Sequence, residues 1–374
     1  MTPIGFSKEK CLKIMQKKDI DFLIASTPEN VFYTSGLPVR HSENNPILYS
    51  LRNSYPSITV VRQNGEESVI AWGVFDPAYT WVQDYRTIFS RGEAIDALLS
   101  IIKEKESQKP NIGIEYKMPF YQFDELKKAF PDAIFTIADD IFTEMRMIKS
   151  EEEIERIKKS TLISEKSILA MLEELREGIT DIELLEIAKT TVVKEGASGW
   201  DHVTLSLGDS DPEAPGTGVK MKKNHITRFD VGAFYKGYCS DISRHAVLGK
   251  APPGVEKTVK QIVDVQQKCI DAIKPDVSAL EINELAQKEF EALGEEFPFF
   301  PTCHGIGIDC EESHLFDPLY PSGQIFKEGM VFELEYWAPY EPYNNRLIGM
   351  EDCFVVTKSG CKRISTLDRL LLFK

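Results

Sequence analysis

The sequence predicts two domains: an α/β domain over residues 1–147, and an α+β domain over residues 148–374 that is built from two similar halves. The length of 374 residues is too great for one ordinary domain and suits two. Strand and helix patterns alternate through the first part, and a long amphipathic helix with a clear start signal separates it from the second. Two segments of the second part then repeat one residue pattern, which indicates a duplicated unit.

The elements of the first domain follow from hydrophobic periodicity and turn residues. Ser7 is a plausible N-cap, and Glu9 places an acid in the first helical turn, where the helix dipole favours it. Asn64-Gly65 separates two strand-like runs and is a strong hairpin signal. The alternation indicates a central sheet with helices on its faces. We expect helices over 7–20, 93–105 and 121–130, a turn followed by a helical turn over 27–36, and strands over 21–26, 57–63, 66–72, 111–116 and 133–139.

A capping box marks the start of the second domain. Glu153 follows Ser150 by three residues, ahead of apolar residues that are spaced to form one face of a helix. We therefore expect one amphipathic helix over residues 145–175 and place the domain boundary near Met147–Ser150. The apolar stripe consists of Ile154, Ile157, Ile163, Ile168 and Leu172.

The second domain contains a weak internal repeat, in which residues 178–196 match residues 276–294 at a constant offset. Each copy has the pattern of a capping box, an amphipathic helix and a closing glycine, with another helix before it and a β-rich segment after it. Capping signals are common, so a chance match is the alternative. Two similar halves would face each other across one site. The matched pairs are Thr180 with Ser278, Glu183 with Glu281, Ala188 with Ala286, and Gly196 with Gly294.

Composition narrows the classes of partner. The formal net charge of −15 argues against nucleic acid and anionic membranes as partners, although acidity can also serve solubility alone. The seven cysteines are odd in number and show no C-x-x-C spacing, so a disulfide framework is not expected and a reducing compartment fits. The sequence shows neither a signal peptide nor an apolar run of ~18 residues. These features predict a cytoplasmic protein that binds no membrane.

The stretch FDVGAFYKGYCSD, residues 229–241, carries Asp230 and Asp241 at the two ends of an apolar hairpin. A turn near Tyr235–Gly237 would pair the flanking strands and bring the two aspartates nearly opposite one another, with Cβ atoms ~5 Å apart. Two bare carboxylates at that distance repel each other, and burial makes their ionisation costly. A divalent metal ion between them is the simplest way to balance the charge.

Further candidate ligands occur in the same domain. His304 precedes a glycine-rich turn in PTCHGIGID, Glu335 lies in GMVFELEYW, and Glu351 and Asp352 lie in LIGMEDCFVVT. Acids inside apolar strands are expensive to bury unless they are paired or bound to metal. Four carboxylates and one imidazole can hold two metal ions, and this oxygen-rich set suits Mn²⁺, with Co²⁺, Zn²⁺ and Fe²⁺ also compatible. Two such ions can activate water and polarise a carbonyl group, which is hydrolytic chemistry.

These motifs resemble the pita-bread metallopeptidase family, which includes Xaa-Pro dipeptidase (prolidase), Xaa-Pro aminopeptidase, methionine aminopeptidase and the metal-free creatinase. The segments DFLIASTPENVFYTSGL and NIGIEY are similar to the creatinase-like N-terminal domain of the proline-specific members. MRMIKSEEEIERIKKS is similar to their connecting segment. Methionine aminopeptidases lack such a domain, so the resemblance favours the two-domain members and covers nearly the whole chain. It also implies a homodimer.

The resemblance implies a dinuclear metal site whose ligands are Asp230, Asp241, His304, Glu335 and Glu351. In this arrangement Asp230 binds one ion, Asp241 and Glu351 bridge both, and His304 and Glu335 complete the shell of the other ion. Glu335 is also the candidate proton shuttle to the leaving nitrogen.

The sequence departs from the family around the substrate. The usual histidine is absent from residues 203–224, and His202 and His225 lie on either side of that segment. Glu311 occupies the place of another usual histidine, and His314 lies three residues later as a candidate catalytic replacement. Gly349 occupies the place of an arginine that the family often carries. We take His202 and Tyr336 as candidate substrate-binding residues, since Tyr336 follows a candidate ligand.

The resulting expectation is an enzyme that cleaves Xaa-Pro bonds in dipeptides or short peptides with two divalent ions. One alternative is a creatinase-like or ectoine-hydrolase-like enzyme that acts on a small amide or C–N bond, because the departures lie around the substrate and spare the metal ligands. An alternative of another class is a pita-bread domain without catalysis that binds peptides or proteins. Retention of all five candidate ligands argues against this last alternative.

Overall fold

The computed structural model describes residues 2–38, 51–104, 109–208, 210, 216–293, 300–316, 323–340 and 346–374. The chain divides into two compact units, Met1–Arg146 and Met147–Lys374. Each unit has its own sheet and its own hydrophobic core. None of the helices in the described ranges combines the length and the apolar character needed to cross a bilayer.

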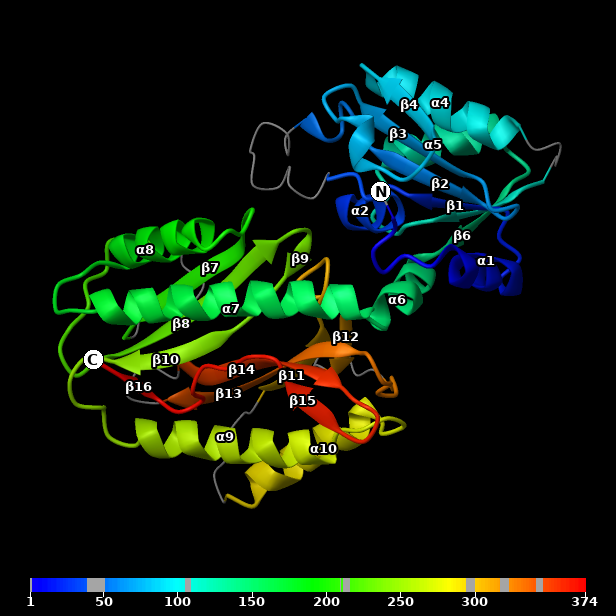
Figure 1. The fold of residues 1–374 in the computed structure, drawn as a ribbon. Helices are drawn as coiled ribbons and strands as arrows, with labels where there is room; N and C mark the ends of the chain where they lie inside the picture. Colours follow the sequence, from blue (N-terminus) through cyan, green and yellow to red (C-terminus); the bar gives the residue numbers. More distant parts are fainter. Residues whose placement is uncertain are drawn as a thin grey trace. The chain divides into compact units, whose positions relative to one another are not determined.

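The first unit contains a six-stranded mixed sheet with helices packed against it (Figure 1, blue to cyan). The strand order is β4-β3-β2-β1-β5-β6; β1/β2 and β2/β3 are antiparallel, and the other pairs are parallel. Its strands are β1 (Phe22–Ala25), β2 (Ile58–Arg62), β3 (Glu67–Trp72), β4 (Asp84–Ile88), β5 (Asn111–Ile114) and β6 (Ile134–Ile137). Its helices are α1 (Lys8–Lys17), α2 (Pro28–Ser35), the 3₁₀ turn η2 (Pro77–Tyr79), α4 (Arg91–Lys103), α5 (Phe120–Ala129) and α6 (Asp139–Met147).

Local sequence explains these elements. The Ser7 side chain accepts a hydrogen bond from the backbone N–H of Lys10 and caps α1, as its position in the sequence predicts. Asn64-Gly65 joins β2 to β3 in the predicted antiparallel hairpin, and Gly65 supplies the positive φ of +89°. Helix α6 is the main difference from prediction, because Met145–Met147 end this helix instead of beginning the next one.

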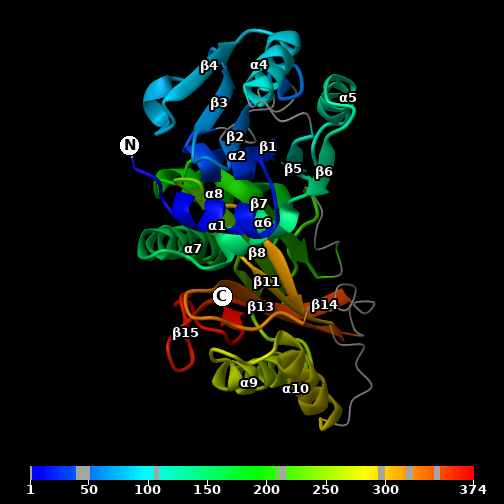
Figure 2. The same cartoon turned by 90° about the vertical axis from the view of Figure 1, so that its right-hand side faces the viewer.

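The second unit contains a ten-stranded sheet flanked by two helix pairs (Figures 1 and 2). The main strand order is β12-β11-β13-β14-β10-β8-β7; β9 pairs with β8, β15 with β14, and β16 with β10. The helices are α7 (Glu151–Glu174), α8 (Asp181–Lys194), α9 (Val255–Ala272) and α10 (Ala279–Glu291). The strands are β7 (Gly199–Leu207), β8 (Ile226–Tyr235), β9 (Tyr238–Cys239), β10 (Ser243–Val247), β11 (Phe300–Gly305), β12 (Ser313–Phe316), β13 (Val331–Tyr340), β14 (Arg346–Val356), β15 (Cys361–Arg363) and β16 (Leu372–Phe373).

The internal repeat is visible in the arrangement of these elements. Helices α7 and α8 cover β7 and β8, while α9 and α10 pack against β13, β14 and β12. Thr180 and Ser278 cap α8 and α10, and each residue also makes an isolated antiparallel bridge, to Lys220 and Ile325 respectively. The two caps differ in detail: Thr180 forms a capping box with Glu183, whereas Ser278 accepts from Leu280 N–H, so the box predicted at Glu281 is absent. The predicted closing residue Gly294 lies outside the described residues.

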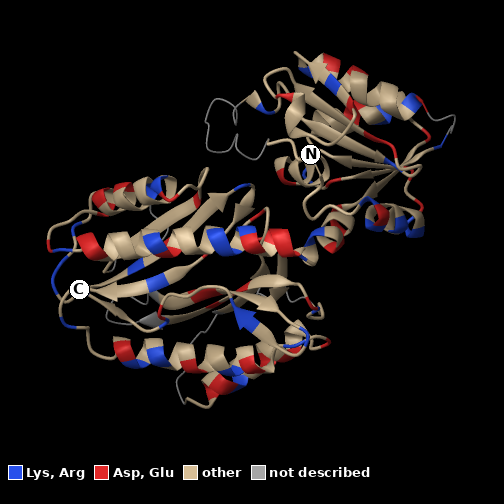
Figure 3. Ribbon diagram, in the orientation of Figure 1, with Lys and Arg blue, Asp and Glu red and all other residues tan. Residues whose placement is uncertain are grey.

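Charge is distributed differently on the helices and strands of the second unit (Figure 3). The flanking helices carry acidic and basic residues together, whereas the strands are largely uncharged and include a few acidic and basic positions. Glu351 is 2% exposed and Asp352 0%, so these strand acids are buried. A buried carboxylate needs a hydrogen bond, a cation or a proton, which directs attention to this part of the sheet.

Candidate metal centre

The two aspartates of the hairpin lie on neighbouring segments of β8 and the β9–β10 region. Lys236 and Gly237 form the turn with φ values of +49° and +88°, close to the turn position that the sequence predicts. Asp230 pairs with Ser243, and Asp241 lies two residues before that partner. The prediction that the aspartates are nearly opposite is therefore wrong by two residues, because a two-residue turn fixes which residues face each other. A shift of two keeps both side chains on one face of the sheet.

His202 on β7 faces both aspartates. Its Nε2 atom lies 3.1 Å from Asp241 Oδ1 and 3.4 Å from Asp230 Oδ1. One oxygen or nitrogen atom from each of these three side chains lies within 4.8 Å of the corresponding atoms of the other two, so they form a group that could hold a metal ion. The structure therefore places His202 against the candidate metal ligands, although the sequence reasoning considered it for substrate only.

A second group of the same kind contains Asp241, His304 and Glu351. His304 on β11 lies with Nε2 3.2 Å from Glu351 Oε1 on β14, and both residues are buried. Asp241 belongs to both groups. A carboxylate shared by two ligand groups has the position that a bridging ligand would need.

Glu335 lies beside these groups. It is directly opposite Glu351 in the β13/β14 register, so the two side chains share a face of the sheet. Its Oε1 lies 3.6 Å from the Arg228 guanidinium, whose Nη2 atom also contacts Asp230 Oδ2 at 2.5 Å. The sequence analysis missed Arg228. The i, i+2 spacing to Asp230 within one strand was the signal that could have placed it on the same face.

The pKa values of these groups are shifted because several buried acids lie close together with few cations. Burial, opposed by Arg228 and reinforced by Asp230 and Asp241, raises the pKa of Glu335 to about 8. Burial and the neighbouring carboxylates, Asp241 first, raise the pKa of Glu351 well above its ordinary value. Burial acts in the same direction on Asp241, but the imidazoles of His202 and His304 outweigh it and lower the pKa of that carboxyl. The acids would be stabilised as carboxylates by additional positive charge.

The residues present fit a divalent metal centre. Asp241 Oδ1 is buried, and no group in the described part of the chain meets the full geometry of a hydrogen bond to it, although His202 Nε2 lies 3.1 Å away. An unsatisfied buried carboxylate oxygen is costly, and a cation is one partner that removes the cost. Carboxylate oxygens and neutral imidazoles are also the donors that divalent first-row metals take. Asp230, Asp241, His304 and Glu351 lie in such groups, and Glu335 adjoins them.

Two further candidate residues from the sequence, Tyr336 and His314, belong to neither of these two groups. Tyr336 is fully buried in the core beneath α9 and α10, with its ring 6.2 Å from that of Phe290. It follows Glu335 on a strand, so it points to the opposite face, and a substrate-binding role is not supported. His314 pairs with His304 across β11 and β12, but its side chain is 41% exposed and lies 3.9 Å from Glu311.

Other polar residues near the centre were not assigned by sequence reasoning. Cys310 Sγ lies 3.0 Å from Asp241 Oδ2. Glu333 is fully buried, two residues before Glu335, and burial followed by the Asp241 charge raises its pKa well above the ordinary value. A loop supplies Cys310, and sequence spacing cannot place a loop residue against a distant strand. The Glu333 position follows from its strand alternation with Glu335.

His245 on β10 stands behind Arg228 as a buried neutral imidazole. The Gly349 N–H donates to its Nε2 at 2.9 Å, so Nδ1 carries the proton and donates to the Thr227 carbonyl at 3.2 Å. A side chain at Gly349 would collide with the ring of Trp337, on which the Arg228 guanidinium stacks at 4.2 Å. Burial, followed by the Arg228 charge, lowers the pKa of His245 to about 3.

This environment of His245 predicts a pH dependence of stability. The unfolded chain protonates His245 near pH ~6.5, whereas the native chain does not until about pH 3. The stabilising contribution is thus complete above pH ~6.5 and is lost as the pH falls, by up to ~1.4 kcal/mol per pH unit. Urea unfolding of His245→Gln and wild type in chelator should show that the variant loses ~2 kcal/mol less between pH 7.5 and pH 5.0. Equal losses would contradict this account, and the exposed His314→Gln serves as control.

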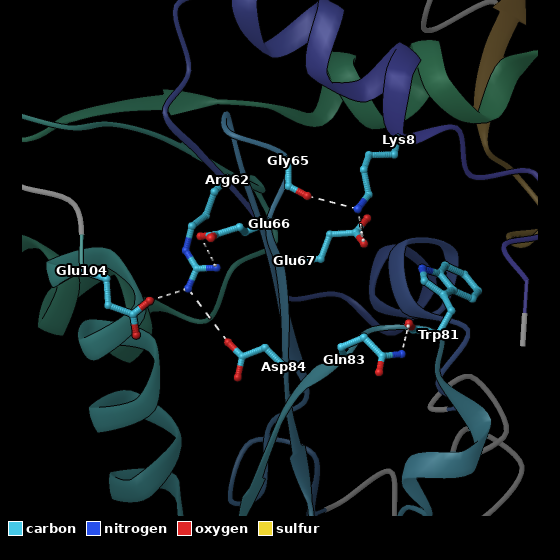
Figure 4. Close-up of a pocket in the computed structure, with 9 residues that line it drawn as sticks. All are labelled: Lys8, Arg62, Gly65, Glu66, Glu67, Trp81, Gln83, Asp84 and Glu104. Atoms are coloured by element: carbon cyan, nitrogen blue, oxygen red, sulfur yellow. Dashed lines mark hydrogen bonds and ion pairs between the residues drawn. The ribbon is translucent and has the colours of Figure 1, made fainter.

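The first unit has a separate hollow of about 470 Å³, drawn in Figure 4. Its cations already have acidic partners: Arg62 lies 2.7 Å from Glu104 and 3.4 Å from Glu66, and Lys8 lies 3.0 Å from Glu67. The lining has two cations and four carboxylates, so both cations are neutralised by neighbouring acids.

Comparison with known proteins assigns the chain to a family. Residues 155–358 match metallopeptidase family M24, and residues 8–148 match the creatinase/prolidase N-terminal domain. The chain belongs to metallopeptidase family M24. The expected creatinase-like N-terminal domain and pita-bread metallopeptidase domain are confirmed, and the chain is a metallopeptidase. Members of this family use divalent metal ions, and the carboxylates and imidazoles of the second unit are suitable ligands for such ions.

Similar proteins extend over the full length of this M24 peptidase. An Xaa-Pro dipeptidase from Pyrococcus horikoshii is 27% identical over 370 residues, which cover 97% of this chain and 98% of that protein. An Xaa-Pro dipeptidase from Pyrococcus furiosus is 25% identical over 376 residues, with 97% and 99% coverage. The structure of an X-Pro aminopeptidase from Thermotoga maritima superposes with a TM-score of 0.81 at 23% identity, covering 98% of this chain and 99% of that one. The similarity to this last structure shows a shared fold only.

Proposed function

We propose that this metallopeptidase is an Xaa-Pro dipeptidase that uses two divalent ions. The observation that supports this proposal most directly is that Asp241 belongs to two metal-capable groups, each of which contains one histidine. Full-length relatives that are Xaa-Pro dipeptidases support the substrate class. The proposed ligands are Asp230, Asp241, His304, Glu335 and Glu351. This oxygen-rich set suits Mn²⁺, and Co²⁺, Zn²⁺ and Fe²⁺ are compatible with it.

When bound, divalent ions in such a site lower the pKa of water and polarise the scissile carbonyl. The chain itself supplies the proton transfer. Glu335 has a pKa raised to about 8, chiefly by burial, and bound cations would lower it again toward the working range. We propose that Glu335 takes a proton from the attacking water and delivers it to the leaving nitrogen. His314, one strand from His304, is proposed to contact the substrate in place of the usual histidine.

A small amide or C–N substrate is the second candidate. The ring of Trp337 covers Gly349, where relatives of this kind often carry an arginine, and the Arg228 guanidinium reaches the site from another strand. Glu311 in place of a histidine also changes the charge near the substrate. These departures favour an altered substrate but leave the proposed ligands intact.

We also propose that the protein is a cytoplasmic homodimer. The family resemblance supports the dimer. No two of the seven cysteines, all of which lie in described parts of the chain, form a disulfide, which suits a reducing compartment.

Proline release from a panel of Xaa-Pro dipeptides, with added Mn²⁺ and again with a chelator, tests the function. We expect release that needs the metal, with no release from matched Xaa-Ala dipeptides and none from Xaa-Pro-Xaa tripeptides. Cleavage of tripeptides would indicate an aminopeptidase. A folded protein that binds two ions but releases no proline would contradict the Xaa-Pro substrate and favour the small-amide candidate.

A further inference from the structure

We propose that His202 is a sixth ligand of the metal centre, binding through Nε2 the ion that Asp230 and Asp241 hold. Asp201 holds the imidazole ring in place for this role. The inference rests on the proposed two-metal function and deepens it, because it adds a ligand from β7 that the five-residue set does not contain.

The distances around His202 are those of ligands on one ion. Its Nε2 lies 3.1 Å from Asp241 Oδ1 and 3.4 Å from Asp230 Oδ1. Nitrogen and oxygen ligands that lie ~2.0–2.1 Å from a first-row ion, at angles of ~90–110°, are separated by ~2.9–3.4 Å. The pair His304 Nε2 and Glu351 Oε1, 3.2 Å apart, has the same separation at the other end of the centre.

The backbone directs His202 toward this centre. The β7/β8 register is irregular between Trp200 and His202, and His202 then pairs with Gly232 on β8. A Cβ at Gly232 would lie 2.5 Å from the His202 ring, so the absence of a side chain at Gly232 makes the room that the imidazole occupies. The imidazole ring thereby lies over β8 at Gly232. It reaches Asp230 on the same strand and Asp241 on the neighbouring segment.

A carboxylate supports the other ring nitrogen. His202 Nδ1 lies 3.4 Å from Asp201 Oδ2, and the Cys239 thiol donates to Asp201 Oδ1 at 3.6 Å. Metal-binding histidines commonly donate their second N–H to a carboxylate, which fixes the tautomer and leaves the first nitrogen free to coordinate. In this arrangement Nδ1 carries the proton and Nε2 presents its lone pair to Asp230 and Asp241.

The surroundings of Asp241 also fit an ion at this end. Its Oδ1 atom is buried, meets the full hydrogen-bond geometry with no described residue, and lies 3.1 Å from His202 Nε2. With His202 included, each metal-capable group that contains Asp241 also contains one imidazole. Two imidazoles in place of one shift the preference of the centre from Mn²⁺ toward Co²⁺, Zn²⁺ or Fe²⁺.

Another explanation of the same contacts is that a protonated His202 acts as a permanent cation between the two aspartates. The two explanations predict opposite effects of removing the ring. A ligand contributes affinity for the ion, so its loss weakens binding. An imidazolium repels the ion, so its loss strengthens binding or leaves it unchanged.

The experiment measures Zn²⁺ and Mn²⁺ binding to the full-length protein by calorimetry, together with metal content after dialysis. We expect two ions in the wild type and, in His202→Ala, one retained ion and a second whose Kd rises by more than the ~10–100-fold typical of lost supporting contacts. Asp201→Asn should raise that same Kd by ~10–100-fold. The Zn²⁺ affinity should fall more than the Mn²⁺ affinity. His225→Ala is the matched control, because His225 joins no metal-capable group among the described residues.

Two other outcomes would contradict the proposal, and they can be told apart. A His202→Ala protein that binds two ions with unchanged or higher affinity would show that His202 is not a ligand while the two-metal function stands. A folded wild type that binds no ion would overturn the proposed function together with this inference. Circular dichroism and the urea midpoint of each variant establish that the protein is folded, so loss of binding is not loss of structure.

Discussion

Asp241→Asn is expected to lose both ions and to lower kcat/KM by at least ~10³-fold. Asp241 is shared by two of the three metal-capable groups among the described residues, so its replacement weakens both ends of the centre at once. The charge that two ions stabilise in hydrolysis contributes several kcal/mol, and ~4 kcal/mol corresponds to ~10³ in rate. Asparagine keeps the size of the side chain, so the loss should come from charge and ligation rather than from packing.

Metal content after dialysis and Xaa-Pro hydrolysis with added Mn²⁺ check this result. Asp264→Asn is the matched control, because Asp264 lies exposed on α9 and pairs with Lys260. Its metal content and activity should equal those of the wild type. An Asp241→Asn protein that retains two ions and full activity would exclude Asp241 as a shared ligand.

Strand alternation could be used on the sequence to predict which side chains of the candidate centre share a face. Glu335 and Glu351 were proposed as ligands because acids inside apolar strands are expensive to bury without a partner, and Asp230 and Asp241 because they end an apolar hairpin. The structure brings them into one part of the second unit, with His304. Alternation also shows why Tyr336 was a poor choice, since a residue that follows Glu335 on a strand must face the other way.

The sequence could not predict contacts that depend on long-range pairing. His202 reaches Asp230 and Asp241 only because β7 pairs with β8 at Gly232, and a register irregularity precedes it. A periodic pattern gives the face of each strand but not which residue of a neighbouring strand lies opposite. The two-residue offset between Asp230 and Asp241 is instead local, because the turn at Lys236 and Gly237 sets the register of that hairpin. Cys310 lies in a loop, where no period applies.

Arg228→Met is expected to lower the free energy of unfolding by ~3–5 kcal/mol in chelator. The Arg228 side chain is 3% exposed and contacts Asp230 Oδ2 at 2.5 Å and Glu335 Oε1 at 3.6 Å. Removing one partner of a buried ion pair leaves the other charge uncompensated, which costs more than the pair itself contributes. Methionine retains part of the apolar contact with Trp337, on which the guanidinium stacks.

Metal should reverse much of this loss, which separates Arg228 from an ordinary core residue. A bound ion supplies the positive charge that Asp230 and Glu335 lack in the variant, and ligand binding to the native state stabilises it in proportion to RT ln(1 + [L]/Kd). Urea unfolding in chelator and in excess Zn²⁺ should therefore give a smaller difference between Arg228→Met and wild type in the metal. Arg176→Met, at an exposed position, should show no difference in either condition. If the variant's free energy of unfolding were lower by the same amount with and without Zn²⁺, Arg228 would stabilise the fold only.

Arg228 also determines how Asp230 can bind. Its guanidinium occupies Oδ2, so Oδ1, the oxygen that faces His202, is the atom left for an ion. In the Arg228→Met protein both oxygens become available, and one ion should bind more tightly than in the wild type. Because the same guanidinium lies near Glu335, the variant should also lose the cation that opposes the raised pKa of that carboxyl. Tighter metal binding combined with a less stable apo protein is the result that a purely structural arginine would not give.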